Sequence, residues 1–280
     1  MSDANTPHIS FEFFPPKTEV GKEKLIAVRK ELNAFNPEYY SVTYGAGGST
    51  RDNTVGIVKQ IRTEGLDVAP HLSFGGDDEA SMIALLNDYK DAGIDRIVAL
   101  RGDMPSGVGG SLQLVYANEL VAFIREHFGD YFHLSVAAYP EIHPEATSYD
   151  DDIRYLKGKF DAGADCAITQ YFFNPDAFFY FMDQCESVGI NKPIYPGIMP
   201  VTNFKNLARF SDACGAEIPR WIRKRLEAYG DDQASIQAFG VDLISELCAM
   251  LLENGVPGFH FYTMNQAEPT RTILNNLNLS

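Results

Sequence analysis

The chain has 280 residues, 45% of them apolar, with 38 acidic against 23 basic side chains and a formal net charge of −15. Binding to nucleic acid draws on clustered lysines and arginines, so the acidic balance argues against that class of partner. No run reaches the roughly 18 uninterrupted apolar residues of a membrane-spanning helix, and residues 1–8 lack the basic-then-apolar pattern of a signal peptide. We therefore expect a soluble, cytoplasmic protein with no membrane partner.

Apolar runs typical of buried parallel strands alternate with amphipathic, helix-like segments along the sequence. Strands are expected near residues 9–14, 39–43, 67–72, 96–100, 133–138, 166–170, 194–198 and 258–262. Helices are expected near residues 21–35, 52–64, 78–92, 116–128, 150–162 and 176–188, with about three more between 203 and 254.

This alternation predicts an α/β fold, a (β/α)8 TIM barrel, rather than an open doubly wound sheet. The long interval before the last strand predicts extra helices between strands 7 and 8. A dinucleotide-binding open sheet is disfavoured because no G-x-G-x-x-G motif follows the first strand. Barrels of this type have about 250 residues, so we expect residues 1–280 to form a single domain.

Polar side chains recur where the expected strands end. A charged or amide group is unfavourable in a strand core, but it is expected where the strand ends of a barrel meet around a ligand. The sequence therefore predicts a functional site at the carboxyl ends of the strands. In chain order, the residues concerned are Glu12, Thr43, His71, Asp103, Tyr139 and Gln170.

Glu12 lies among Phe11, Phe13 and Phe14 in the first expected strand. Removal of a carboxylate from water raises its pKa, which would suit Glu12 to general-acid catalysis. The alternative is that Glu12 points outward from an alternating strand.

Asp103 and three histidines are further candidates near strand ends. Asp103 ends an Arg-Gly-Asp tripeptide before a loop rich in glycine and proline, where a ligand contact and a salt-bridged turn are both open. His71, His143 and His260 lack metal-ligand spacing, so we expect no metal and favour a role at a cofactor, with a buried structural role open for His260. The four cysteines are widely spaced, which indicates reduced thiols rather than a disulfide framework.

Taken together, eight ordered motifs resemble the methylenetetrahydrofolate reductase family. The match covers essentially the whole chain, and we expect the short bacterial type, without the regulatory domain of the longer eukaryotic enzymes. The motifs are FEFFPP at 11–16, SVTYGA at 41–46, APHL at 69–72, ALRGD at 99–103, SVAAYPE at 135–141 with HPEA at 143–146, ITQ at 168–170, PGIMP at 196–200 with NFK at 203–205, and FHFYTMN at 259–265.

The resemblance implies a flavin-binding barrel and an oxidoreductase of one-carbon metabolism. In such enzymes NADH or NADPH reduces bound FAD, and FAD then transfers a hydride to 5,10-methylenetetrahydrofolate, giving 5-methyltetrahydrofolate for methionine synthesis in a ping-pong cycle. No arginine cluster for a 2′-phosphate is evident, which favours NADH. A homo-oligomer, either dimer or tetramer, is also expected from the family.

The resemblance further implies roles for individual residues. Glu12 corresponds to the general acid that protonates N10 of the folate, Asp103 to a carboxylate near flavin and pterin, and Gln170 to an amide that contacts the pterin. Thr43 corresponds to a nicotinamide contact. The implied cofactor-binding set is Thr43, Tyr44, Ala46, His71, Arg101, Gly102, Asp103, Ala117, Tyr139, His143, Ala146, Asp152, Tyr155 and Lys159, and the implied substrate-binding set is Asp103, Gln170, Asn206, Phe210, Met264 and Gln266.

The chain departs from the family pattern at several of these positions. Tyr155 stands in place of Asn, and Gly158 in place of a basic residue beside Lys159, which removes a cation from the expected FAD diphosphate site. Asn206 stands in place of Gln, and Gln266 in place of a basic residue that meets the folate tail.

Two other classes of protein remain as alternatives. A Schiff-base aldolase barrel requires a lysine at a strand end, and none of the eight expected strands carries one there. An inactivated barrel acting as an interaction subunit should have lost Glu12, Asp103 and Gln170, and all three are present.

Overall fold

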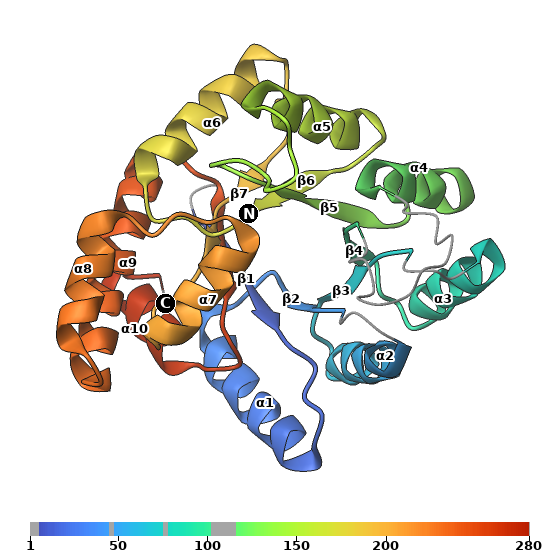
Figure 1. The fold of residues 1–280 in the computed structure, drawn as a ribbon. Helices are drawn as coiled ribbons and strands as arrows, with labels where there is room; N and C mark the ends of the chain where they lie inside the picture. Colours follow the sequence, from blue (N-terminus) through green and yellow to red (C-terminus); the bar gives the residue numbers. More distant parts are fainter. Residues whose placement is uncertain (1–5, 45–47, 75–77, 102–115, 280) are drawn as a thin grey trace.

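The core of the molecule is a ring of parallel strands surrounded by helices (Figure 1). The computed structural model describes residues 6–44, 48–74, 78–101 and 116–279, apart from the side chains of residues 48–52. The strands pair in the order β7-β6-β5-β4-β3-β2-β1-β9-β8, and all of these pairs are parallel. Their bounds are β1 (His8–Phe13), β2 (Tyr39–Val42), β3 (Val68–Leu72), β4 (Arg96–Ala99), β5 (His133–Ala138), β6 (Cys166–Thr169), β7 (Ile194–Tyr195), β8 (Gly197–Ile198) and β9 (Gly258–Tyr262).

Pro196 divides the expected seventh strand into β7 and β8. Proline has no backbone N–H and cannot donate to a strand ladder, so regular pairing is interrupted at this residue. Because β7 pairs with β6 and β8 pairs with β9, these two consecutive segments join the two edges of the sheet. The carbonyl of Pro196 accepts a hydrogen bond from His260 N at 3.0 Å. The predicted (β/α)8 barrel is confirmed, with an interruption in its seventh strand.

Helices follow the strands and form the outer layer of the barrel (Figure 1). The three helices between β8 and β9 confirm the predicted insertion, whereas α10 is an element that the sequence pattern does not indicate. The helices are α1 (Glu19–Leu32), α2 (Gly48–Thr63), α3 (Glu79–Asp91), α4 (Ala117–Phe128), α5 (Tyr149–Asp161), α6 (Pro175–Ser187), α7 (Phe204–Cys214), α8 (Arg220–Tyr229), α9 (Gln233–Glu253) and α10 (Glu268–Asn276), with a 3₁₀ turn η1 (Asn33–Phe35) after α1.

The strands bury side chains on both of their faces. Phe11 and Phe13 are fully buried in the large apolar core that the strands share with the helices. Successive side chains of a strand point to opposite faces, so Ser10 and Glu12 face the barrel interior. A second, smaller apolar cluster consists of Tyr39, Ala69, Val98 and Ile168.

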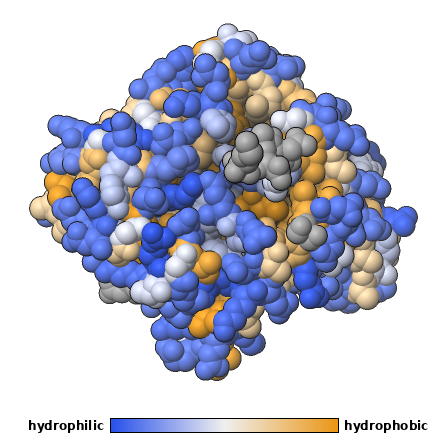
Figure 2. Space-filling view, turned by 180° about the vertical axis from the view of Figure 1, so that it is seen from behind, coloured by the Kyte–Doolittle hydropathy of each residue, from blue (hydrophilic) through white to orange (hydrophobic). Residues whose placement is uncertain are grey.

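One described helix, α9, is long and apolar enough by length and composition to cross a membrane. A core helix of a soluble protein passes the same test. In the structure Ile244, Leu247 and Leu251 of α9 are buried in the large core. Hydrophilic residues cover most of the face drawn in Figure 2, in keeping with the high charge of the chain.

Gly240 of α9 packs closely against the segment that follows β8. A Cβ atom at Gly240 would lie 2.6 Å from Val201 Cβ and 2.7 Å from Val201 O, next to the segment that follows β8. We expect Gly240→Ala to destabilise the chain by about 1–3 kcal/mol through overpacking. The matched control is Gly56→Ala on α2, which meets no atom within 4 Å and should stabilise the chain by roughly 0.5–1 kcal/mol. Urea unfolding of both variants measures the difference, and equal effects would contradict this packing.

Candidate active site

A cavity of about 370 Å³ opens at the carboxyl ends of the strands. Its walls come from β1, β3, β4, β5, β6 and β9 and from α7, so side chains far apart in sequence meet there. The cavity brings together six of the residues that the sequence analysis singles out. These are Glu12, His71, Tyr139, Gln170, Phe210 and Met264.

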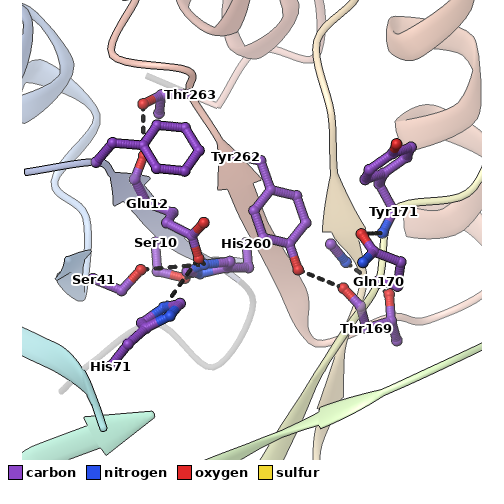
Figure 3. A network of polar contacts seen from close by, with 12 residues as sticks. Ser10, Glu12, Ser41, His71, Thr169, Gln170, Tyr171, His260, Tyr262 and Thr263 are labelled. Atoms are coloured by element: carbon purple, nitrogen blue, oxygen red, sulfur yellow. Dashed lines mark hydrogen bonds and ion pairs between the residues drawn. The ribbon is translucent and has the colours of Figure 1, made fainter. Parts of the chain in front are cut away.

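Glu12 points into this cavity, and only 8% of the residue is exposed (Figure 3). Its neighbours Phe11 and Phe13 lie on the opposite face of β1 and pack into the outer core. The alternative in which Glu12 points outward from the strand is therefore wrong.

Two histidines hold the carboxylate of Glu12. His71 Nε2 lies 3.1 Å from Glu12 Oε2, and His260 Nε2 lies 3.4 Å from the same oxygen. The ring of His260 is fully buried, and its Nδ1 lies 2.7 Å from Ser10 Oγ. Ser41 Oγ lies 3.4 Å from His260 Nε2. The buried position that was left open for His260 is therefore confirmed, and His260 is also a direct partner of Glu12.

His71 differs from His260 in its geometry toward Glu12. Although the two atoms lie 3.1 Å apart, His71 Nε2 is buried and makes no hydrogen bond within the described residues. A buried polar atom without a partner is costly, and in a cavity it indicates a place where a ligand can bind. His71 is therefore both a charge partner of Glu12 and a polar group left for a bound molecule.

The expected rise in the pKa of Glu12 is wrong. Burial does raise the pKa of this carboxyl, but the charge of His71 and the hydrogen bond and charge of His260 outweigh burial and lower it to about 2. Both imidazoles come from strands distant in sequence, so the local run of phenylalanines gives no sign of them. The carboxylate is therefore ionised at neutral pH.

Gln170 follows β6 on the other side of the cavity. Its Oε1 accepts a hydrogen bond from Tyr171 N at 3.0 Å, and its own backbone N donates to Ala138 O at 2.8 Å. The first bond orients the side-chain amide, while its Nε2 makes no hydrogen bond to any described residue. The amide can therefore donate to a ligand in the cavity.

A second group of charged residues lies beyond the ends of β4 and β5. Arg101 Nη1 lies 2.5 Å from Glu145 Oε2, and Lys159 Nζ donates to Ala137 O at 2.8 Å. Asp152 Oδ2 accepts from the backbone N of His143 at 2.7 Å. The ring of His143 lies edge-on to that of Tyr139, with centroids 4.6 Å apart.

Burial changes the protonation of this second group. Burial lowers the pKa of Lys159 to about 8. The positive charge of Arg101 lowers this pKa further, whereas the negative charge of Asp152 raises it. Burial also raises the pKa of Asp152 and lowers the pKa of His143. A partly buried lysine and an arginine beside aromatic side chains form a donor set that fits an anionic ligand with planar rings.

The remaining predicted residues are absent from the cavity lining or lie outside the described residues. Thr43 and Tyr44 follow β2, Ala117 begins α4, and Ala146 N donates to His143 O in the loop before α5. Tyr155, Asn206 and Gln266 are exposed and do not line the cavity. Ala46, Gly102 and Asp103 lie outside the described residues.

Tyr262 is a cavity residue to which the sequence analysis assigns no role. In the register of the barrel Glu12 lies opposite Tyr262, and Ser10 opposite His260. Since alternate residues of a strand face the same side, the inward position of His260 could have predicted that Tyr262 also faces the cavity. Phe14, Met199 and Cys214 also line the cavity, although no site role was predicted for them from the sequence.

Comparison with known proteins gives a family for this arrangement. The family model described as methylenetetrahydrofolate reductase matches residues 1–278. The 5,10-methylenetetrahydrofolate reductase of Escherichia coli (strain K12) is 41% identical over 271 residues, which cover 96% of this chain and 90% of the relative. The chain belongs to the methylenetetrahydrofolate reductase family.

Two further similarities extend beyond the short enzymes of this family. Methylenetetrahydrofolate reductase (NADH) 1 of Arabidopsis thaliana is 38% identical over 284 residues, covering 96% of this chain and 48% of the relative. An uncharacterised protein from Clostridium thermocellum, solved with two copies of 5-methyl-5,6,7,8-tetrahydrofolic acid, has a TM-score of 0.65 at 19% identity and covers 97% of this chain and 94% of its own. The second similarity shows the shared fold.

The ionised state of Glu12 makes a testable contribution to stability. Its pKa in the folded chain, about 2, lies below the ordinary value of 4.5, so its contribution is fully present above about pH 4.5 and is lost as the pH falls toward 2. We expect Glu12→Gln to remove this contribution, at most about 3 kcal/mol. Urea unfolding between pH 2 and 7 should therefore show a difference between wild type and Glu12→Gln that shrinks in acid.

The exposed carboxylate Glu23 on α1 provides the control, since Glu23→Gln should leave the pH dependence of unfolding as in wild type. A difference between wild type and Glu12→Gln that grows in acid would contradict the ionised state of Glu12.

Proposed function

We propose that this chain is a flavin-dependent methylenetetrahydrofolate reductase, in which NADH or NADPH reduces bound FAD and the hydride then passes to 5,10-methylenetetrahydrofolate. The product is 5-methyltetrahydrofolate for methionine synthesis, and the two substrates react in turn in a ping-pong cycle. The observation that supports this function most directly is the buried Glu12 with its two histidines, across one cavity from Gln170, in a chain of this family. The NADH-named plant relative favours NADH as reductant.

The residues present fit FAD. Lys159 and Arg101 would hold its diphosphate, and Tyr139 and His143 would border the rings beside β5. The buried Nε2 of His71, which has no hydrogen-bond partner among the described residues, gives a polar contact for the flavin. When bound, FAD accepts and donates the hydride, which no side chain of the protein can do.

Tyr155 changes the outer part of the cofactor site relative to the family pattern. It is 54% exposed on α5, and the guanidinium of Arg154 lies 5.6 Å from the centre of its ring. With Gly158 replacing a basic residue, Lys159 and Arg101 are the cations that remain for the diphosphate among the cofactor residues carried over from the family.

Glu12, with His71 and His260 beside it, supplies the proton that opens the folate ring. N10 has to be protonated for the five-membered ring to open, and a carboxyl with a pKa of about 2 stores no proton of its own at neutral pH. His260 Nε2 lies 3.4 Å from Glu12 Oε2, so this ring is placed to pass a proton to or from the carboxylate. Ser10 at Nδ1 fixes the ring of His260 for this task.

Other side chains bind and orient the folate. The free Nε2 of Gln170 donates to the pterin, and Phe210 and Met264 give apolar contacts in the same cavity. Asp103 would lie near flavin and pterin and stabilise positive charge as it develops on the folate. We further propose a cytoplasmic, single-domain enzyme that forms a homo-oligomer, either dimer or tetramer.

Substitution of the proton donor should separate the two half-reactions. We expect Glu12→Gln to leave NADH-driven bleaching of the flavin band intact and to slow folate reduction by about 10²- to 10⁴-fold, the usual contribution of a general acid. Anaerobic stopped-flow spectroscopy measures both steps. The matched control is Glu38→Gln, another glutamate paired with a histidine but placed before β2, away from the cavity. Equal losses in both half-reactions would rule out the role of Glu12.

FAD affinity should depend on the charge of Lys159. The pKa of about 8 means that the ammonium loses its charge as the pH rises through 8, so FAD should bind more weakly above that pH. We expect Lys159→Gln to lower FAD affinity by about 10- to 100-fold at pH 7, as for loss of a hydrogen bond to a charged group, and to remove this pH dependence. Titration of apoprotein with FAD, followed by flavin fluorescence, is the measurement.

Lys157→Gln on the same helix, where the lysine pairs with Asp161, is the control and should bind FAD like wild type. An unchanged pH dependence in Lys159→Gln would show that another group meets the diphosphate.

A further inference from the structure

The residues at the end of β9 make hydrogen bonds to two strands, to the neighbouring β1 and to β6 across the cavity. The hydroxyl of Tyr262 donates to the backbone carbonyl of Thr169 at 2.7 Å, and Thr169 directly precedes Gln170. The next residue, Thr263, donates from its Oγ1 to the backbone carbonyl of Glu12 at 2.6 Å. Figure 3 shows the ring of Tyr262 reaching from the Glu12 side toward Thr169 and Gln170.

The Tyr262 contact is built into the barrel around Gly197. A Cβ atom at Gly197 would lie 2.0 Å from Thr169 O, 2.7 Å from Tyr262 Cε2 and 2.9 Å from the Tyr262 hydroxyl oxygen. Any side chain at Gly197 would therefore displace both partners of the hydrogen bond. Thr169 is also held by its own hydroxyl, which accepts from Gly197 N at 2.9 Å.

The segment that follows Thr263 also bonds to the end of β1. The side-chain amide of Asn265 pairs with Phe14, accepting from its N–H and donating to its C=O, both at 2.9 Å. Met264 and Asn265 have φ values of 53° and 55°, a left-handed conformation that is uncommon for residues other than glycine. Surrounding contacts have to maintain such a conformation, and this clustering is typical of functional sites.

The two strand ends that these bonds connect are not neighbours in the sheet. β1 pairs with β2 and β9, whereas β6 pairs with β5 and β7. No ladder of hydrogen bonds therefore fixes the distance between Glu12 and Gln170 directly. The ring of Tyr262 lines the cavity between them, and its hydroxyl connects the Glu12 side directly to Thr169.

We propose that Tyr262 is a positioning residue, which with Thr263 sets the distance between Glu12 and Gln170 and so aligns the proton donor with the pterin contact. Its role in catalysis rests on the proposed function. The folate has to meet Glu12 at N10 and Gln170 at the pterin at once, and reacting groups need placement within about 0.5 Å. Burial and the charge of Glu12 raise the pKa of Tyr262, so its hydroxyl stays protonated and continues to donate.

Tyr262→Phe removes the bond and keeps the ring. We expect flavin reduction at saturating NADH to stay at the wild-type rate, and kcat/KM for 5,10-methylenetetrahydrofolate to fall by about 3- to 10-fold, the loss that one net hydrogen bond accounts for. Gly197→Ala, which acts on the same contact by steric clash, should lose at least as much of the folate step. If Gly197→Ala does not fold, Tyr262→Phe alone decides.

Tyr131→Phe is the matched control, because the Tyr131 hydroxyl also donates to a backbone carbonyl, that of Lys90 at 3.3 Å, but outside the cavity lining. We expect wild-type rates in both half-reactions for this variant. Tyr262→Phe values equal to those of Tyr131→Phe, or equal losses in both half-reactions, would overturn the positioning role.

Amide hydrogen exchange in the protein without folate tests the same contact independently of activity. In Tyr262→Phe the amides of residues 169–171 should exchange faster than in wild type, while residues 12–14, held by Thr263 and Asn265, should not change. Unchanged exchange at 169–171 would overturn the proposal. A wild-type protein that fails to reduce folate would refute the proposed function instead. The exchange result would still show whether the Tyr262 hydroxyl holds the end of β6.

Discussion

The buried negative charge of Glu12 is the constraint on which the site depends. A carboxylate inside a barrel is unfavourable unless positive charge and hydrogen bonds compensate it, and His71 and His260 provide that compensation from β3 and β9. His260 in turn has to be fixed by Ser10. Four inward-facing residues on three strands thus form one unit, which explains why polar side chains occupy positions that a barrel usually fills with apolar ones.

The fold could be predicted from the sequence because strand and helix periodicity are local. The eight strands and the insertion before the last strand all follow from apolar runs and their spacing. The division of the seventh strand at Pro196 also has a local cause, the missing N–H, although which strand each half pairs with depends on closure of the barrel. The same alternation along β1 places Glu12 on the inner face once Phe11 and Phe13 are assigned to the outer core.

The protonation of the site could not be predicted in this way. The expectation for Glu12 relied on its phenylalanine neighbours. Burial does raise its pKa, but His71 on β3 and His260, which lies 248 residues away in sequence, together lower it by more. The hydrogen bond of Tyr262 could not be predicted for the same reason, because its partner Thr169 lies on β6, which does not pair with β9 in the sheet. Long-range contacts across the barrel determine both properties, and motif spacing contains no information about them.

We propose that this one cavity passes a hydride from reduced flavin to the folate, with the proton supplied by Glu12 and its histidine partners. The most direct test is to reduce the FAD-loaded enzyme with light, in the absence of NADH and oxygen, and then mix it with 5,10-methylenetetrahydrofolate. We expect the oxidised flavin band to return and 5-methyltetrahydrofolate to form in equal amount. A flavin that stays reduced, in an enzyme that binds FAD and reacts with NADH, would contradict this proposal.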